Sequence, residues 1–166
     1  MHMHRLFHFL IDPGPTLGLR PLPRLAMAIA LLAGRVWLAL PFLRAGLHRL
    51  NSWDSQAYLF TEVHPVPFLP ATISAPLTTG AEIVLGLALI AGLGGRAAAA
   101  GLGVMAAALF LVIGRTPQGM ENGIALASEQ VPWIAAALVL TILGPGLLSL
   151  DAARRRLFSP PAGTLP

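Results

Sequence analysis

Four long apolar runs, separated by short polar stretches, constrain this chain more than any other feature. They cover approximately residues 25–50, 76–94, 97–114 and 130–150, and each is close to or longer than the roughly 20 residues that cross a bilayer core. Only 11% of the 166 residues are charged, against roughly 25% in ordinary soluble domains. The pattern predicts an all-α integral membrane protein built as a four-transmembrane-helix bundle.

The same pattern divides the chain into an N-terminal tail (1–24), a transmembrane domain (25–150) and a C-terminal tail (151–166). Residues 51–75 are polar and interrupted by prolines, so we expect a loop there, with Trp53, Tyr58 and Phe60 as interfacial anchors. Pro76 is expected to open the second span. The short turn at residues 94–96 makes the second and third spans antiparallel neighbours, and Gly144-Pro145-Gly146 should end the fourth.

The distribution of arginines predicts the orientation in the membrane. Both tails and the turn at Arg96 carry arginines, whereas the two other connections hold Asp54, Glu62, Glu121 and Glu129. The positive-inside rule then puts both termini in the cytoplasm, as expected for a protein of the bacterial inner membrane. Because the arginines are scattered among apolar runs, the pI near 11.4 does not indicate a nucleic-acid partner. We expect the lipid bilayer as partner, together with other subunits or a second copy of the chain.

Glu82 is the one charge in the second run. It lies about six residues from the outer end of that run, or roughly 8 Å deep at 1.5 Å per residue. An ionisable group at this depth is costly unless it has a partner or a purpose. Two interpretations remain open: Glu82 forms a structural pair with an arginine, or it handles a ligand or a proton.

Helical phase indicates which arginine can reach Glu82. At about 100° per residue, one face of the first span contains Arg35, Ala39, Phe42, Gly46 and Arg49, and the opposite face contains Trp37, Pro41, Arg44 and His48. The first face holds the small residues and is the better candidate for the bundle interior. We therefore expect Arg49 as the first partner of Glu82, with Arg44 second if a kink at Pro41 rotates the outer part of the helix.

Arg35 and His48 are candidate cofactor contacts on the first span. Arg35 could equally extend its side chain to the cytoplasmic headgroups. His48 and His64 could bind a metal or haem, but no second histidine lies in a span to complete an axial pair, so we expect neither haem nor a metal site. The chain has no cysteine for an iron–sulfur cluster. The glycine pattern at residues 101–106 follows no strand, so it does not indicate an NAD site.

In their order along the chain, several segments resemble the DoxX family of small bacterial membrane proteins. The resemblance covers roughly residues 30–151 and rests on Arg35-Val36, Gly46-Leu47-His48-Arg49-Leu50, the loop Val63–Pro70, Glu82 ahead of Leu85–Leu93, Arg96, and Gly144–Asp151. The chain departs from many members of the family before the fourth span, where Glu129-Gln130-Val131-Pro132-Trp133 stands in place of a histidine.

The resemblance implies a four-span bundle associated with redox systems, such as a membrane subunit of a quinone-linked oxidoreductase. In that hypothesis Glu82 with Arg49 or Arg44 is the catalytic group, Arg35 and His48 contact the cofactor, and quinone is the candidate cofactor. The alternative is a membrane anchor or assembly module for partner proteins, some of them in metal handling, in which the same ion pair only fixes the register of the helices.

The predicted orientation can be tested with single cysteines, because the chain has none of its own. Cysteines introduced at Ser55 and Gln118 should react with a membrane-impermeant maleimide applied from outside, and one at Ala162 should react only after the membrane is permeabilised. The reverse pattern of labelling would show that the orientation is inverted.

Overall fold

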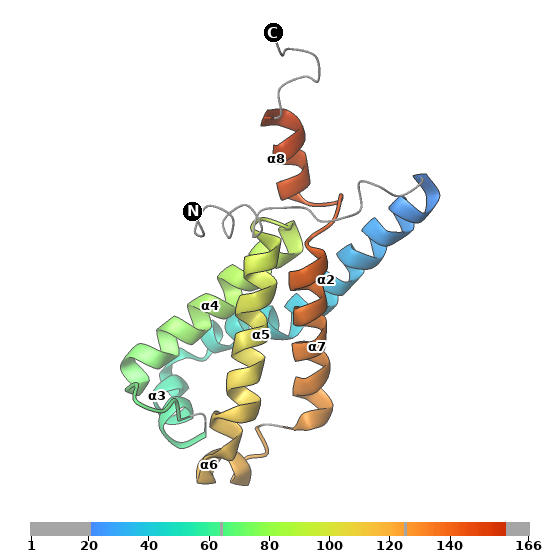
Figure 1. Cartoon of the computed structure of the whole chain (residues 1–166). Coiled ribbons are helices and arrows are strands. Elements are labelled where there is room, and N and C mark those ends of the chain that lie inside the picture. The colour runs from blue at the N-terminus through green and yellow to red at the C-terminus, as the bar shows by residue number, and fades with distance from the viewer. Residues whose placement is uncertain (1–20, 64, 125, 159–166) are drawn as a thin grey trace, which may run out of the picture.

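The computed structural model describes residues 21–63, 65–124 and 126–158 (Figure 1). Within these ranges every secondary-structure element is helical, which confirms the all-α class. His64, residues 1–20 of the expected N-terminal tail and residues 159–166 of the expected C-terminal tail lie outside the described residues.

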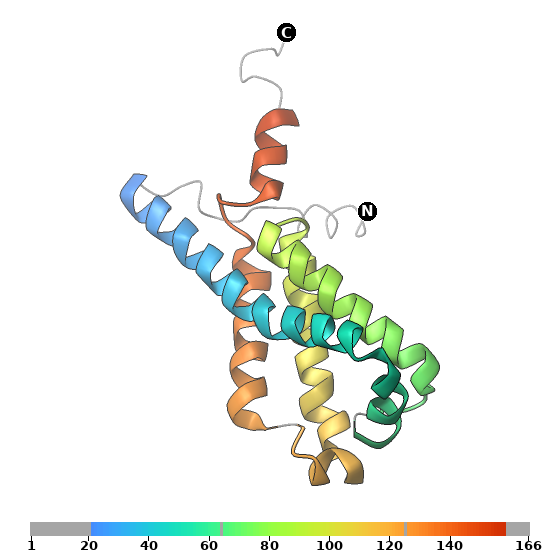
Figure 2. The same cartoon turned by 180° about the vertical axis from the view of Figure 1, so that it is seen from behind.

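Four long helices form the body of the molecule: α2 (Pro21–Asn51), α4 (Ala71–Ala91), α5 (Gly95–Leu111) and α7 (Ala127–Leu143). Successive members of this set run in opposite directions (Figure 1). The most extensive packing joins α5 to α7 and α2 to α4, and α4 packs against α5. Seen from behind, α2 and α4 lie side by side and both are inclined to α5 and α7 (Figure 2).

The length and composition of these helices support a membrane protein. Three segments are long and apolar enough to cross a bilayer, namely Pro23–Asn51, Ala71–Ala91 and Gly95–Arg115, whereas the apolar part of α7, Glu129–Leu143, is shorter. Large apolar side chains are exposed on the outside of the helices, among them Val84, Leu87, Val104 and Leu138. Such a surface suits contact with lipid.

One expected helix boundary is wrong and another is confirmed. Helix α4 begins at Ala71, after Pro70 in an extended conformation, so that Pro76 lies exposed inside the helix instead of opening it. Helix α7 begins at Ala127 and ends at Leu143, so Gly144-Pro145-Gly146 ends this helix as expected, although the apolar run continues to Leu150. It stops there because Gly144 adopts φ 81° and ψ 178°, a conformation that glycine tolerates and a helix does not contain.

The connection after α2 contains short helical turns at residues 53–63, which corrects the expected loop there, whereas residues 65–70 form no helix. A 3₁₀ turn η2 (Trp53–Ser55), the short helix α3 (Gln56–Tyr58) and the π-helical turn η3 (Leu59–Val63) follow one another. The next long connection contains η4 (Ile113–Arg115) and α6 (Pro117–Glu121). Segments α3 and α6 lie at the same end of the molecule (Figure 1), and α6 packs against η3.

The expected inner face of α2 is confirmed. Ala39, Phe42 and Gly46 are buried, and the side chain of Trp37 on the opposite face is 50% exposed. The core that this face contacts consists largely of small side chains and leucines; its buried members include Leu38, Leu89, Ala98, Ala99, Leu102 and Ala106.

Small residues also set how closely the helices approach. A Cβ atom at Gly101 of α5 would lie 2.7 Å from Leu85 Cδ1 of α4, and one at Gly103 would lie 2.7 Å from Ala137 Cβ of α7. Close backbone approach of this kind provides the dispersion contacts that hold helices together in lipid.

The last described element is helix α8 (Leu150–Phe158), in the region expected to be a tail. It follows the Gly144–Ser149 segment and extends from the end of the bundle where α4 and α5 are joined (Figure 1).

Gly46 provides a test of the contact between α2 and α4. A Cβ atom there would lie 2.7 Å from Ile83 Cγ1, 3.2 Å from Glu82 Cβ and 3.3 Å from Thr79 O, whereas a Cβ at Gly80 on α4 meets nothing within 4 Å. Gly46→Ala should therefore lower the free energy of unfolding by about 1–3 kcal/mol through overpacking. The matched control Gly80→Ala should leave it unchanged or raise it slightly, because alanine favours helix. Thermal unfolding in detergent followed by circular dichroism measures both; equal melting temperatures for the two variants would contradict the close contact.

Candidate functional site

An ion pair joins α2 to α4 near one end of the bundle. Arg49 Nη1 lies 2.5 Å from Glu82 Oε2 and donates a hydrogen bond to it. Glu82 is only 3% exposed. Gly46 lies about one helical turn before Arg49, and the absence of a side chain there lets α4 approach at Glu82 itself. Arg49 was the first of the two expected partners, and this pairing is confirmed.

Phe60 covers the guanidinium group of Arg49. Its ring comes from η3, and Arg49 Cζ lies 5.4 Å from the ring centroid, within the range of a cation–π interaction. Phe60 is 4% exposed, so its expected role as an interfacial anchor is wrong, while Trp53 and Tyr58 are exposed. No sequence signal separates Phe60 from its aromatic neighbours, because the π-helical turn that carries Phe60 inward has no periodic pattern.

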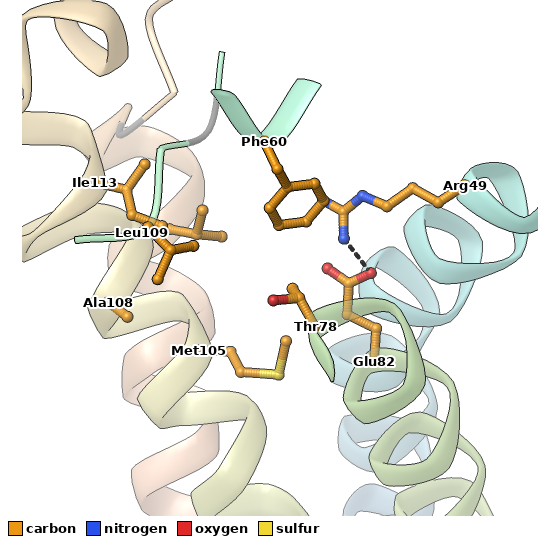
Figure 3. A pocket seen from close by; sticks show the side chains of 9 residues that line it. Arg49, Phe60, Thr78, Glu82, Met105, Ala108, Leu109 and Ile113 are labelled. Atoms are coloured by element: carbon orange, nitrogen blue, oxygen red, sulfur yellow. Dashed lines mark hydrogen bonds and ion pairs between the residues drawn. The ribbon is translucent and has the colours of Figure 1, made fainter. Parts of the chain in front are cut away.

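A cavity of about 140 Å³ lies beside the ion pair. Figure 3 shows the side chains of Arg49 and Glu82 on one side of it and those of α5 on the other. Apart from the ion pair and Thr78, the lining is apolar; it consists of Phe60, Val66, Met105, Ala108, Leu109 and Ile113. The chain therefore presents one cation and one carboxyl group to a small apolar space.

The ion pair retains capacity for a further partner. Guanidinium has five N–H donors and a carboxylate has two acceptor oxygens, and the bond between Arg49 and Glu82 uses one atom of each. A molecule in the cavity could thus accept a hydrogen bond from Arg49 and exchange a proton with Glu82. The carbonyl oxygen of a ligand can accept the hydrogen bond from Arg49 and can receive the proton from Glu82.

Arg44 and His48 do not belong to this site. Both are exposed on α2 and neither lines the cavity, so Pro41 does not turn Arg44 toward Glu82 and the second expected partner does not pair with it. The helix continues through Pro41 from Pro21 to Asn51. Its phase is preserved closely enough that Arg49 stays on the buried face.

Arg35 lies on the same face as Arg49 but about 21 Å away along the helix, at 1.5 Å per residue. Its side chain is fully buried and Nη2 donates a hydrogen bond to the carbonyl oxygen of Leu148. The interpretation that Arg35 extends to the lipid headgroups is therefore wrong, and the structure does not bring it to the cavity. Its Nε and Nη1 atoms have no hydrogen-bond partner among the described residues.

Asp151 completes a second polar cluster around Arg35. Its carboxylate accepts hydrogen bonds from Gly94 N at 2.9 Å and Gly95 N at 3.0 Å, at the start of α5, and its own N–H donates to Gly92 O at 3.0 Å. The carboxylate also interacts electrostatically with Arg35. This cluster binds the segment before α8 to the turn between α4 and α5.

The close fit at Gly92 explains why this turn contains glycine. Gly92 has φ +68°, and a side chain there would collide with Arg35 Nη1 and Ser149 Cβ. A residue other than glycine would therefore be strained by its backbone conformation as well as excluded by its neighbours. Asp151 was part of the motif Gly144–Asp151, but its bonds to backbone N–H groups could not be inferred from sequence spacing.

The long apolar helices have the length and composition of an α-helical membrane protein. A model of the DoxX family matches residues 30–115, which is more than half of the chain. The chain belongs to the DoxX family, as the motif resemblance implied. The matched region includes Arg35, Arg49, Glu82 and Arg96 but not Asp151. Comparisons with curated proteins and with solved structures give no match.

The Asp151 cluster predicts a measurable loss of stability. Asp151 is 2% exposed, and Asp151→Ala would leave two N–H groups of α5 and the buried Arg35 without their acceptor and counter-charge. We expect the free energy of unfolding to fall by about 2–4 kcal/mol. Asp54→Ala, which removes an exposed carboxylate, is the control and should change it by less than about 0.5 kcal/mol. Chemical denaturation in mild detergent measures both variants, and equal stability of the two would refute the capping role.

Proposed function

We propose that this DoxX protein is a membrane subunit of a quinone-linked redox system and that its cavity binds the ring of a quinone. Arg49 donates a hydrogen bond to a quinone oxygen, and Glu82 exchanges protons with it. A partner subunit supplies the electrons, so that quinone, two electrons and two protons give quinol. In this proposal Arg49 and Glu82 contact the substrate directly.

The observation that carries the proposal is the composition of the cavity. A space of about 140 Å³ is close to the engineered apolar cavity of about 150 Å³ in another protein that binds benzene. It therefore suits one six-membered ring. The apolar lining favours the ring, and the single ion pair provides the few polar contacts that orient a ligand in such a site.

The placement of the site in a bilayer follows from a four-span arrangement, which is part of the proposal. Helices α2, α4, α5 and α7 alternate in direction, and the 17 residues of α7 reach the lower limit for a membrane span. With both termini in the cytoplasm of a bacterium, the cavity lies near the outer face of the inner membrane. A lipophilic quinone can reach that depth from within the bilayer.

A second candidate function is that of an assembly module. A shallow groove of about 260 Å³ runs between α5 and α7, and its lining is almost entirely apolar; it consists of Ala100, Gly103, Val104, Ala107, Ile134, Ala137, Leu138 and Thr141. Small residues of this kind admit the helix of another subunit. In this alternative the ion pair of Arg49 and Glu82 fixes helix register and has no chemical task.

The two candidates are separated by removing the ion pair as a whole. The double variant Glu82→Gln with Arg49→Met replaces both charges at similar volume, so it leaves no unpaired buried charge, which is the main cost of breaking such a pair. If the site binds quinone, the affinity for a short-chain quinone in nanodiscs should fall at least about tenfold, because each lost hydrogen bond to a charged group contributes about 1.5–3 kcal/mol. Isothermal titration calorimetry measures the affinity, and circular dichroism checks that the variant is folded.

A matched control makes the same kinds of substitution, Arg to Met and Glu to Gln, at two residues away from the cavity. The double variant Arg44→Met with Glu62→Gln alters two exposed residues and should bind quinone like the unaltered protein. A folded variant at Glu82 and Arg49 that binds quinone normally would contradict the proposal. Retention of partner subunits by that variant, with no quinone bound to either protein, would favour the assembly module.

A further inference from the structure

Helix α8 is fixed at the end of the bundle opposite the cavity. The carboxylate of Asp151, in its first turn, accepts hydrogen bonds from Gly94 N and Gly95 N where α5 begins. Arg35 binds the carbonyl oxygen of Leu148 two residues before the helix. Because α4 and α5 both have the length and composition of membrane spans, the turn between them marks a membrane surface. The start of α8 is therefore held at that surface (Figure 1).

The arginines of α8 lie at the depth of the lipid headgroups. Arg154 and Arg156 follow Asp151 by three and five residues, so they lie about 4.5 and 7.5 Å further along the helix axis. The headgroup layer on each side of a bilayer is roughly 5–7 Å thick. Both side chains are exposed, so their guanidinium groups are available to this layer.

The remaining residues of α8 make it amphipathic. Asp151 and Ala152 face the bundle and are 2% and 4% exposed. Leu150 and Leu157 lie on a different face, at positions i and i+7, and are 52% and 80% exposed. A short helix that exposes leucines beside arginines has the pattern of helices that lie in a membrane interface.

We propose that α8, which projects from the bundle in the structure (Figure 1), tilts onto this surface and binds anionic phospholipid headgroups, with Arg154–Arg156 contacting the phosphates and Leu157 inserting between the lipids. The charge complementarity favours anionic over neutral lipids, and the leucine face favours a lipid layer over an acidic protein. The proposal is independent of quinone binding, because it concerns the opposite end of the molecule.

A fluorescent probe on α8 tests this directly. With Leu157→Cys as the only cysteine of the chain, an environment-sensitive label is attached and the protein is placed in nanodiscs of phosphatidylcholine alone or mixed with phosphatidylglycerol. The label should show blue-shifted emission and protection from aqueous quenchers only with phosphatidylglycerol, and added salt should reduce both effects.

Charge variants supply the controls. Changing Arg154, Arg155 and Arg156 together to Gln should abolish the response to phosphatidylglycerol, since each basic residue contributes about fivefold to the preference for an anionic surface and three contribute about a hundredfold. Changing them to Lys should retain it. Arg115→Gln should have no effect, because Arg115 lies in η4, which packs against α6 at the other end of the molecule (Figure 1).

The outcomes that overturn the proposal are equally specific. An acidic protein partner, in place of lipid, would leave the label with the same emission in both kinds of nanodisc. A response to phosphatidylglycerol that survives in the Gln variant would show that the arginines are not its cause. Because these three side chains are exposed, the Gln variant should elute from size-exclusion chromatography like the unaltered protein, and this check excludes misfolding as the reason for a lost response.

Discussion

Charged groups among apolar helices must find their partners inside the protein, because lipid offers none. This constraint accounts for both polar clusters of the structure. Arg49 and Glu82 neutralise one another between α2 and α4, while Arg35 uses a backbone carbonyl and the charge of Asp151 near the other end. Between the two clusters the helices meet through alanine, glycine and leucine. Packing between these small and leucine side chains has no preferred direction. The two polar clusters therefore define how the helices are aligned with one another.

The site beside Glu82 is a consequence of unequal helix spacing. Gly46 brings α2 and α4 together so closely that the carboxylate meets Arg49, whereas α4 and α5 leave a cavity between them at the same level. The turn η3 then places Phe60 over the guanidinium. A charged pair is held at the edge of an apolar space without being immersed in it, which is the arrangement on which the proposed quinone binding depends.

Periodic features could be predicted from the sequence and contacts between distant segments could not. The buried face of α2 and the partner of Glu82 follow from helical phase and depth, because both are properties of single helices. The positions of Phe60 and Asp151 depend on turns whose conformation is decided by tertiary contacts, and Asp151 binds backbone N–H groups that carry no sequence signal. The end of α7 at Leu143 is also predictable, because Gly144-Pro145-Gly146 stops a helix even though the apolar composition continues to Leu150.

The helices of this protein differ greatly in length, and a bilayer must adapt to that difference. The apolar segment of α2, Pro23–Asn51, has 29 residues and is about 44 Å long, whereas that of α5, Gly95–Arg115, has 21 residues and is about 32 Å long. A hydrocarbon core of roughly 30 Å matches the shorter segment upright, but the longer one fits only when it is tilted. The incline of α2 to α5 and α7 (Figure 2) relieves this hydrophobic mismatch. Membrane thickness therefore becomes a variable that acts on the incline of α2, and so on its contact with α4, where the ion pair lies.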